Sequence, residues 1–411
     1  MTLRRFTLCL RGFCGQPSTA AGLLLSTAMA VTVQAAPRTP TDDAEVLERL
    51  PLRAGNSAQR ELAALRAQAR DNPADADTAV RLAERYFDQA MASGDPRHVG
   101  HAEAVLNKVK GPPSAARLAI QGQLLQYRHD FDEALRTFAA ALALDPERAE
   151  AHAWRAAIFL VQADYAQALG ECEALRRLER PVLQAGCTGL AQAYGGQLLA
   201  GERTLANALA DAALPDSRLW LLTRLGEVAA WRGQPALAER HYRAALALGL
   251  DDSYLLAAWC DFLLDQGRPA EVVRQLAGWE NADPLLLRLA EAESALELPM
   301  AAAHVRMLGE RFAAAGQRGD TTHRAEEARY QLRLRNDPAR AVQLARANYA
   351  VQREPRDARM LLEAAIAAGD VAAAQPALDW LRRSGFEDAH LRKLAEAAAR
   401  SPAVQKSAVT R

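Results

Sequence analysis

The stretch 114–146, SAARLAIQGQLLQYRHDFDEALRTFAAALALDP, constrains the fold most, because it recurs in weaker form across most of the chain. Its apolar residues are spaced as on two helices, and a polar turn at 128–130 separates them. Pro146 follows the second helix, and a proline ring cannot continue a helix. The stretch therefore predicts one helix-turn-helix unit.

Prolines repeat along the chain with a period of roughly 34 residues or about twice that value. They stand at Pro73, Pro113, Pro146, Pro181, Pro215, Pro284 and Pro355. Half of the residues are hydrophobic but only 6% are aromatic, and runs of Ala, Leu and Arg favour helices over strands. We therefore expect an all-α repeat array over residues 57–356, curved and open, whose core grows by stacking.

The unit resembles the tetratricopeptide repeat (TPR), in which small residues let two antiparallel helices approach closely. The clearest units are 114–146, 149–178 and 219–249. Their matching packing positions are Gly122, Ala134, Phe138, Ala141, Pro146, Ala156, Ala168, Gly226, Ala238, Tyr242 and Ala245. The resemblance implies a TPR-like helix-turn-helix solenoid wound as a right-handed superhelix.

Other units match less well. The unit 183–214 places Gly195 and Gly196 within a predicted helix, and from residue 253 onward Val272 and Leu276 replace an alanine and an aromatic residue. Three predicted helices, 357–368, 371–384 and 388–399, would cap the array as a segment 357–400. Residues 401–411 are predicted to be disordered.

The N-terminal segment 1–36 has the pattern of a secretory signal peptide. Arginines at 4, 5 and 11 precede an uncharged run at 20–33, and small residues precede Ala36. Cleavage would leave a polar linker, 37–56, and no stable membrane span; the alternative is an uncleaved anchor. We expect a periplasmic or secreted bacterial protein.

The charge pattern and the motifs exclude several function classes. Fifty basic residues balance fifty acidic ones without a basic tract, so nucleic-acid binding is not expected. Phosphate-binding glycine loops, GxSxG and HExxH are absent from the sequence, so we expect neither an enzyme, nor a cofactor, nor a metal site. His98 and His101 have metal-like spacing, but two loop residues are too few for zinc.

The first helices of stacked units should line a concave groove. Continuing the repeat phase places eight candidate partner-binding residues there: Gln123, Gln126, Tyr127, Trp220, Glu227, Trp231, Tyr254 and Asp261. Aromatic anchors suit an extended peptide or a partner helix, although any single aromatic residue could simply pack between helices.

Three functions follow from this groove. The favoured one is an exported scaffold or adaptor that holds a protein or peptide, and the resemblance implies roles in assembling cell-envelope or secretion machinery. The first alternative is a carbohydrate-binding solenoid in polysaccharide export or turnover, with Trp220 and Trp231 stacking on sugar rings. A helical-toroid enzyme would need acids such as Glu227 and Asp261 to converge in a closed pocket.

Three cysteines remain after signal cleavage. Cys172 and Cys187 are predicted on consecutive helices and could form a disulfide in an oxidising compartment. Equally, all three could be small buried apolar residues. If the pair forms, Cys260 is left over.

Overall fold

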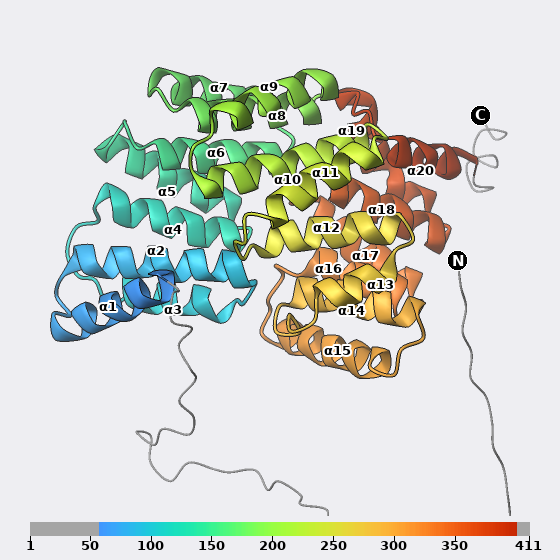
Figure 1. Cartoon of the computed structure of the whole chain (residues 1–411), viewed down its shortest axis with the longest axis horizontal. Coiled ribbons are helices and arrows are strands. Elements are labelled where there is room, and N and C mark those ends of the chain that lie inside the picture. Colours follow the sequence, from blue (N-terminus) through green and yellow to red (C-terminus); the bar gives the residue numbers. More distant parts are fainter. Residues whose placement is uncertain (1–56, 401–411) are drawn as a thin grey trace, which may run out of the picture. The chain divides into compact units, whose positions relative to one another are not determined.

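The computed structural model describes residues 57–400, which consist of helices joined by turns and loops, and no strand occurs among them (Figure 1). The predicted signal peptide, linker and C-terminal tail fall in 1–56 and 401–411, outside the described residues. The expected all-α solenoid is confirmed.

Ten helices make up the first half: α1 (Ser57–Asp71), α2 (Ala76–Ser93), α3 (Arg97–Leu106), α4 (Ala115–Tyr127), α5 (Phe131–Leu144), α6 (Ala149–Val161), α7 (Tyr165–Arg177), α8 (Pro181–Tyr194), α9 (Leu198–Asp211) and α10 (Pro215–Trp231). Ten more follow: α11 (Pro235–Leu246), α12 (Ser253–Asp265), α13 (Pro269–Gln275), α14 (Asp283–Ala295), α15 (Ala301–Gln317), α16 (Arg324–Arg333), α17 (Pro338–Tyr349), α18 (Pro355–Ala368), α19 (Val371–Ser384) and α20 (Ala389–Arg400).

From α2 onward, successive helices pack in pairs, and each even-numbered helix also contacts the next even-numbered one, up to α20. These helices form what we call the even-helix face. The last three, α18 to α20, coincide with the three predicted C-terminal helices. Left-handed Gly369 and Gly385 end α18 and α19, as glycine does at many helix C-termini.

The packing positions predicted from the repeat lie at the contacts within helix pairs. A Cβ on Gly122 would approach the ring of Phe138 to 2.7 Å, and one on Gly226 would approach the ring of Tyr242 to 2.8 Å. The remaining members are buried: Ala134, Ala141, Ala156, Ala168, Ala238 and Ala245. Pro146 is the exception, because it is exposed in the loop between α5 and α6.

Pro181, Pro215 and Pro355, which mark the predicted period, each occupy the first position of a helix, where the missing N–H is tolerated. One detail of the predicted repeats is wrong. Gly195 and Gly196 are not within a helix: α8 ends at Tyr194, and the two glycines form the turn to α9, where Gly196 has φ +85°.

The expectation of an open array is also wrong, because the second half of the array packs onto the turns of the first. One hydrophobic core contains side chains from α6 to α10 together with side chains from α16 to α20. Polar contacts between segments far apart in the sequence join the halves. They include Ser253 Oγ to the carbonyl oxygen of Met91 (2.6 Å), Gln352 Nε2 with His129 Nε2 (3.2 Å), the Arg353 amide to the carbonyl oxygen of Val161 (2.7 Å), and Trp380 Nε1 to Tyr165 Oη (2.8 Å). Turns that present backbone carbonyls and small residues allow this close approach.

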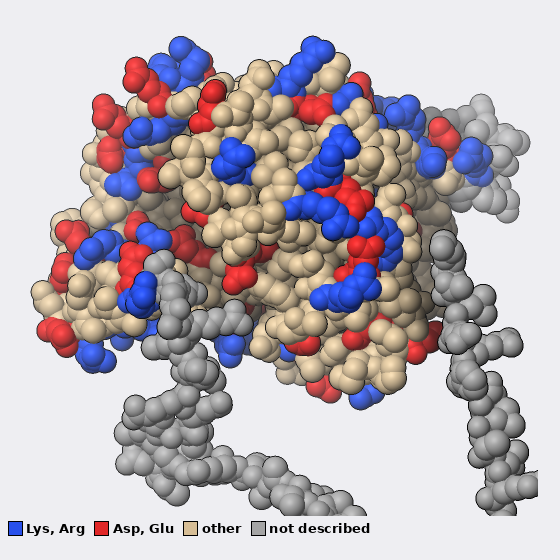
Figure 2. Space-filling model, viewed as in Figure 1, with Lys and Arg blue, Asp and Glu red and all other residues tan. Residues whose placement is uncertain are grey.

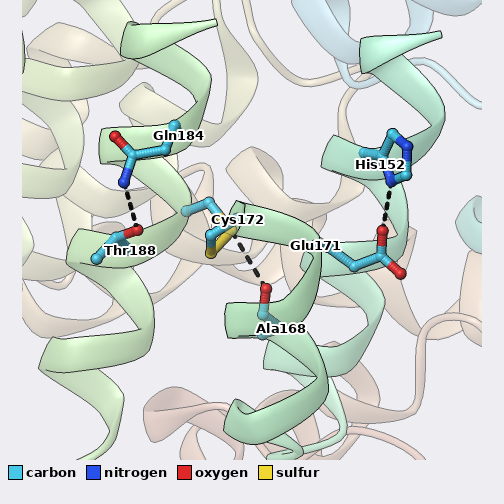
Figure 3. The surroundings of a disulfide bond; sticks show 7 residues. His152, Ala168, Glu171, Cys172, Gln184 and Thr188 are labelled. Carbon is cyan, nitrogen blue, oxygen red and sulfur yellow. Dashed lines mark hydrogen bonds and ion pairs between the residues drawn. A yellow bond between two sulfur atoms is a disulfide. The ribbon is translucent and has the colours of Figure 1, made fainter. Parts of the chain in front are cut away.

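A disulfide joins Cys172 on α7 to Cys187 on α8, with 5.5 Å between their Cα atoms (Figure 3). Next to it, Glu171 points toward α6, where its carboxylate bonds His152 Nδ1 at 2.6 Å. Cys260 is buried as a free thiol, and burial raises its pKa to about 12. The bridge therefore links two consecutive repeats, while Cys260 is part of the core.

Candidate functional site

Four side chains of the even-helix face stack as alternating aromatic rings and guanidinium groups. The guanidinium carbon of Arg224 lies 5.5 Å from the ring centroid of Trp220 and 4.2 Å from that of Tyr254. The guanidinium carbon of Arg356 lies 5.6 Å from the same Tyr254 ring. We call these four residues the stacked ladder. Cation–π attraction holds such an arrangement together, most strongly where it is shielded from water.

Three helices supply the ladder. Trp220 and Arg224 are four residues apart on α10, so they share one face of that helix. Tyr254 stands in the first turn of α12, and α10 contacts α12 directly. Arg356 stands in the first turn of α18, about a hundred residues further along the chain. The fold therefore assembles the ladder from remote segments.

Glu227 fixes the middle of the ladder. Its carboxylate accepts hydrogen bonds from Tyr254 Oη at 2.6 Å and from Arg224 Nη1 at 2.9 Å, and Arg224 also donates to Tyr254 Oη. Burial raises the pKa of Tyr254, so the phenol stays protonated. Burial would lower the pKa of Arg224, but Tyr254 and Glu227 outweigh it and raise that pKa, so the guanidinium stays charged.

The two ends of the ladder are accessible although its middle is not. Trp220 is 37% exposed, and the Arg356 side chain is 58% exposed even while it donates to Glu354 at 2.7 Å. The side chains of Arg224 and Glu227 are each only 14% exposed. A rigid, hydrogen-bonded centre thus presents an indole at one end and a guanidinium at the other.

The eight groove residues predicted from the sequence do not form one site. Trp220, Glu227 and Tyr254 come together in and beside the ladder. Trp231 does not line an open groove, because its ring packs against Tyr194 and Phe386, with centroids 5.8 Å and 5.3 Å away. The docking of the C-terminal segment places Phe386 against this tryptophan, which is partly buried.

Asp261 belongs to a separate ion-pair network. Its carboxylate accepts from Arg288 and Arg329 at 2.6 Å each, and Arg329 also reaches Glu291. Burial would raise the pKa of Asp261, but the two arginines outweigh it and lower that pKa to about 2. Glu227 and Asp261 thus pair with different arginines rather than with one another.

The three remaining predicted residues lie on α4. Gln123 and Gln126 are partly exposed there, and neither takes part in the ladder. Tyr127 is partly exposed as well, and burial of its phenol, reinforced by the negative charges of Asp320 and Glu326, raises its pKa to about 12.

Sequence reasoning missed both arginines of the ladder. Arg224 could have been found, because an arginine four residues after a tryptophan on a helix can lie over the indole. Arg356 left no local signal, since only the tertiary fold brings α18 to α12.

Residues 57–400 hold no cluster of three side chains able to bind a metal ion. His98 and His101 lie on α3 and not in a loop as expected, and their rings lie beside Tyr86. None of the described helices is both long and apolar enough to cross a membrane.

Comparisons with solved structures found several chains that are similar to this one. The chain shares the fold of Cut9 in the APC/C hetero-tetramer Cut9–Hcn1, with 13% identity, coverage of 83% of this chain and 67% of that one, and a TM-score of 0.51. Yeast Tom70 aligns at 13% identity over 86% of this chain and 89% of that one, with a TM-score of 0.39. The human IFIT1 dimer with m7Gppp-AAAA aligns at 17% identity over 84% of this chain and 86% of that one, with a TM-score of 0.38.

No curated protein matches the sequence. A family model described as tetratricopeptide repeat matches residues 172–315, a segment that includes α8 to α14 and therefore three of the four ladder residues. The matched segment and the helix-pair architecture on either side of it agree with the resemblance found in the sequence, and the chain carries tetratricopeptide repeats over residues 172–315.

Proposed function

We propose that this protein is an exported scaffold that holds a segment of a partner protein against the even-helix face at the stacked ladder, and that it serves the assembly of cell-envelope or secretion machinery. The observation that carries the proposal is the ladder itself, whose centre is fixed and whose ends are exposed. Tryptophan, tyrosine and arginine are the residue types that dominate binding energy at interfaces. Anchors that are already ordered lose little conformational entropy on binding.

Export is supported by two independent features. The segment 1–36 combines early arginines, an apolar run and small residues before the expected cleavage site. The disulfide between Cys172 and Cys187 suits an oxidising compartment outside the cytoplasm. Fusing the first 60 or so residues to a reporter enzyme that is active only after export tests this part. An inactive reporter would contradict it.

The carbohydrate alternative finds less support. Two exposed indoles would be needed to stack on neighbouring sugar rings, but Trp231 is packed against Tyr194 and Phe386. Of the two indoles, Trp220 is exposed and Trp231 is partly buried. We therefore favour a protein partner.

Site-specific photo-crosslinking in living cells tests the partner site. A photoreactive amino acid replaces Trp220 in one strain and Leu296 in another. Both native side chains are 37% exposed, and Leu296 follows the end of α14, a helix that contributes no residue to the ladder. We expect one discrete protein adduct from position 220 and none from position 296. Adducts to glycan alone, or the same adducts from both positions, would contradict the proposal.

A further inference from the structure

We propose that the partner segment is basic and amphipathic, and that it binds a patch at the Trp220 end of the stacked ladder. This inference rests on the proposed function and names the chemistry of the partner. The patch consists of three exposed apolar side chains, Leu183, Leu214 and Trp220, together with the neighbouring carboxylates of Asp88, Asp216 and Asp252.

The apolar part lies near the N-terminal ends of α8 and α10, two helices in contact. Leu183, Leu214 and Trp220 are 43%, 67% and 37% exposed, and they are among the few large apolar side chains that the described residues leave open to solvent. The indole of Trp220 sits against Gly186, where a Cβ would come within 2.6 Å of the ring, and Leu183 precedes Gly186 by one helical turn. Neighbouring exposed apolar side chains of this kind mark interaction surfaces.

The acidic part adjoins the indole. Asp216 stands one turn before Trp220 on α10, and Asp252 caps the N-terminus of α12 by accepting from the Leu255 amide at 2.6 Å. Burial raises the pKa values of Asp252 and Asp88, and the nearby charge of Asp216 raises both further. α12 also contacts α2 and α10 directly, and Ser253, next to Asp252, donates its hydroxyl to the carbonyl oxygen of Met91, about one turn after Asp88. The three carboxylates therefore share one region although they come from α2, α10 and the N-terminus of α12.

Few cations offset these carboxylates. Arg85 pairs with Asp88 at 2.8 Å, and the charge of Arg224, already bound to Glu227, also acts on Asp252. The closest arginine in sequence, Arg218, is turned away, because its guanidinium donates to the carbonyl oxygens of Leu209 and Ala212. Figure 2 shows acidic side chains in the hollow that the N-terminal ends of α10 and α12 border. The region carries a surplus of negative charge.

Such a patch selects its occupant by charge. An arginine or lysine of the partner gains attraction both from the open part of the indole and from the carboxylates. Apolar residues next to that arginine or lysine in the partner segment cover Leu183 and Leu214. A segment rich in Asp or Glu is repelled by the carboxylates. A guanidinium on Trp220 would also continue the alternation of rings and cations along the ladder.

Two labelled synthetic peptides test the inference by fluorescence anisotropy with the full chain. Both carry leucines at the same positions; the other positions are arginine in one peptide and glutamate in the other. We expect the arginine peptide to bind and the glutamate peptide not to bind. The paired substitution Asp216→Asn and Asp252→Asn should weaken binding at least about tenfold, and Trp220→Ala should weaken it too. Asparagine at 252 keeps its ability to cap α12.

The matched control is Glu310→Gln, which removes an exposed acid on α15. It should leave the affinity unchanged. Equal binding of both peptides, or an equal loss in the Glu310 variant, would overturn the inference, because binding would then follow apolar content or overall charge and not the patch.

The crosslinking experiment separates this inference from the proposed function. A protein adduct whose crosslinked segment is acidic or uncharged would overturn the inference and leave the scaffold function standing. The opposite result, patch-dependent peptide binding without a protein adduct in cells, would contradict the function and support the chemistry of the patch.

Discussion

Gly196 lies directly against the carbonyl oxygen of Ser384, the last residue of α19, although almost two hundred residues, or about six repeats, separate the two in the sequence. A Cβ at position 196 would come within 2.7 Å of the carbonyl oxygen of Gly385, and closer still to that of Ser384. The contact joins the α8–α9 turn to the end of α19, at the edge of the core that α8 to α10 share with α18 to α20. Glycine is therefore the residue that lets the C-terminal helices dock.

Replacing Gly196 with alanine should loosen this docking. Alanine would be strained at φ +85° and would clash with two backbone carbonyls, so we expect a loss of about 1–3 kcal/mol in the free energy of unfolding. Urea unfolding measures the loss, and hydrogen exchange should show faster exchange in α19 and α20. The matched control is Gly233→Ala in the α10–α11 turn, which has φ +69° but open space around its Cβ. Equal losses in both variants would mean that the docking contact contributes nothing.

The repeat fold was predictable because its signals are local. Glycine and alanine at fixed positions, and apolar residues at helical spacing, are visible within any one unit, and each unit mainly contacts its neighbours. The docking of α19 onto the α8–α9 turn was not predictable, since Gly196 looks like a helix breaker in a degenerate repeat. Only the folded chain shows that its missing side chain makes room for Ser384.

The close approach within one repeat gives a second prediction. Gly226→Leu should lower the free energy of unfolding by about 1–3 kcal/mol or more, because even a Cβ would lie 2.8 Å from the buried ring of Tyr242. Thermal and urea unfolding measure the change. As a control, Gly170→Ala on α7 has no atom within 4 Å of the new Cβ, and it should stabilise the protein by about 0.5–1 kcal/mol. An unchanged midpoint for Gly226→Leu would show that the contact with Tyr242 does not constrain the repeat.

Removing the disulfide should destabilise the protein. Replacing Cys172 and Cys187 with alanine opens a loop of 15 residues, for which chain entropy predicts a loss of about 3 kcal/mol. Urea unfolding with and without a reductant measures it, and the reductant should shift the wild-type midpoint but not that of the double variant. Cys260→Ala keeps the bridge, so its midpoint should still respond to the reductant. If complete reduction leaves the urea midpoint of the wild-type protein unchanged, the prediction is contradicted.

The hydroxyl of Tyr254 should contribute to stability through the ladder. Tyr254→Phe removes the bonds to Glu227 and Arg224, so we expect a loss of about 1–3 kcal/mol in the free energy of unfolding. The chain offers a close control in Tyr349, which is 4% exposed and whose hydroxyl has no hydrogen-bond partner in the described structure. Tyr349→Phe should be neutral or stabilising. If both variants lose the same stability, the network around Glu227 is not what holds Tyr254.

The candidate site was only partly predictable. The phase of α10 and α12 placed Trp220, Glu227 and Tyr254 on one face, because helical periodicity fixes which side chains share a face. Neither Arg224 nor Arg356 was among the predicted site residues, yet these two arginines stack the rings together. A charge buried against an aromatic ring has the same sequence signature as a charge in water.

Asp357 should make the stability of α18 depend on pH. Its carboxyl is 3% exposed and accepts hydrogen bonds from Asn348 Nδ2 at 2.8 Å and from the Glu354 amide at 3.0 Å. Burial, reinforced by the charge of Glu354, raises the pKa of Asp357 to about 7, although Arg356 opposes the rise. The folded chain therefore holds a proton that the unfolded chain, with an ordinary aspartate pKa near 3.8, releases.

The sign of the effect follows from this difference. The contribution of Asp357 to stability is fully present below about pH 4 and is lost as the pH rises to about 7. Asp357→Asn does not titrate, so the stability of the wild type minus that of the variant should fall across this window. Urea unfolding of both proteins at several pH values measures the difference, and the subtraction removes carboxylates such as Asp261, whose lowered pKa acts in the opposite direction. A difference that stays flat or rises with pH would contradict a raised pKa, because a carboxyl stabilised in its charged form loses its contribution on acidification instead.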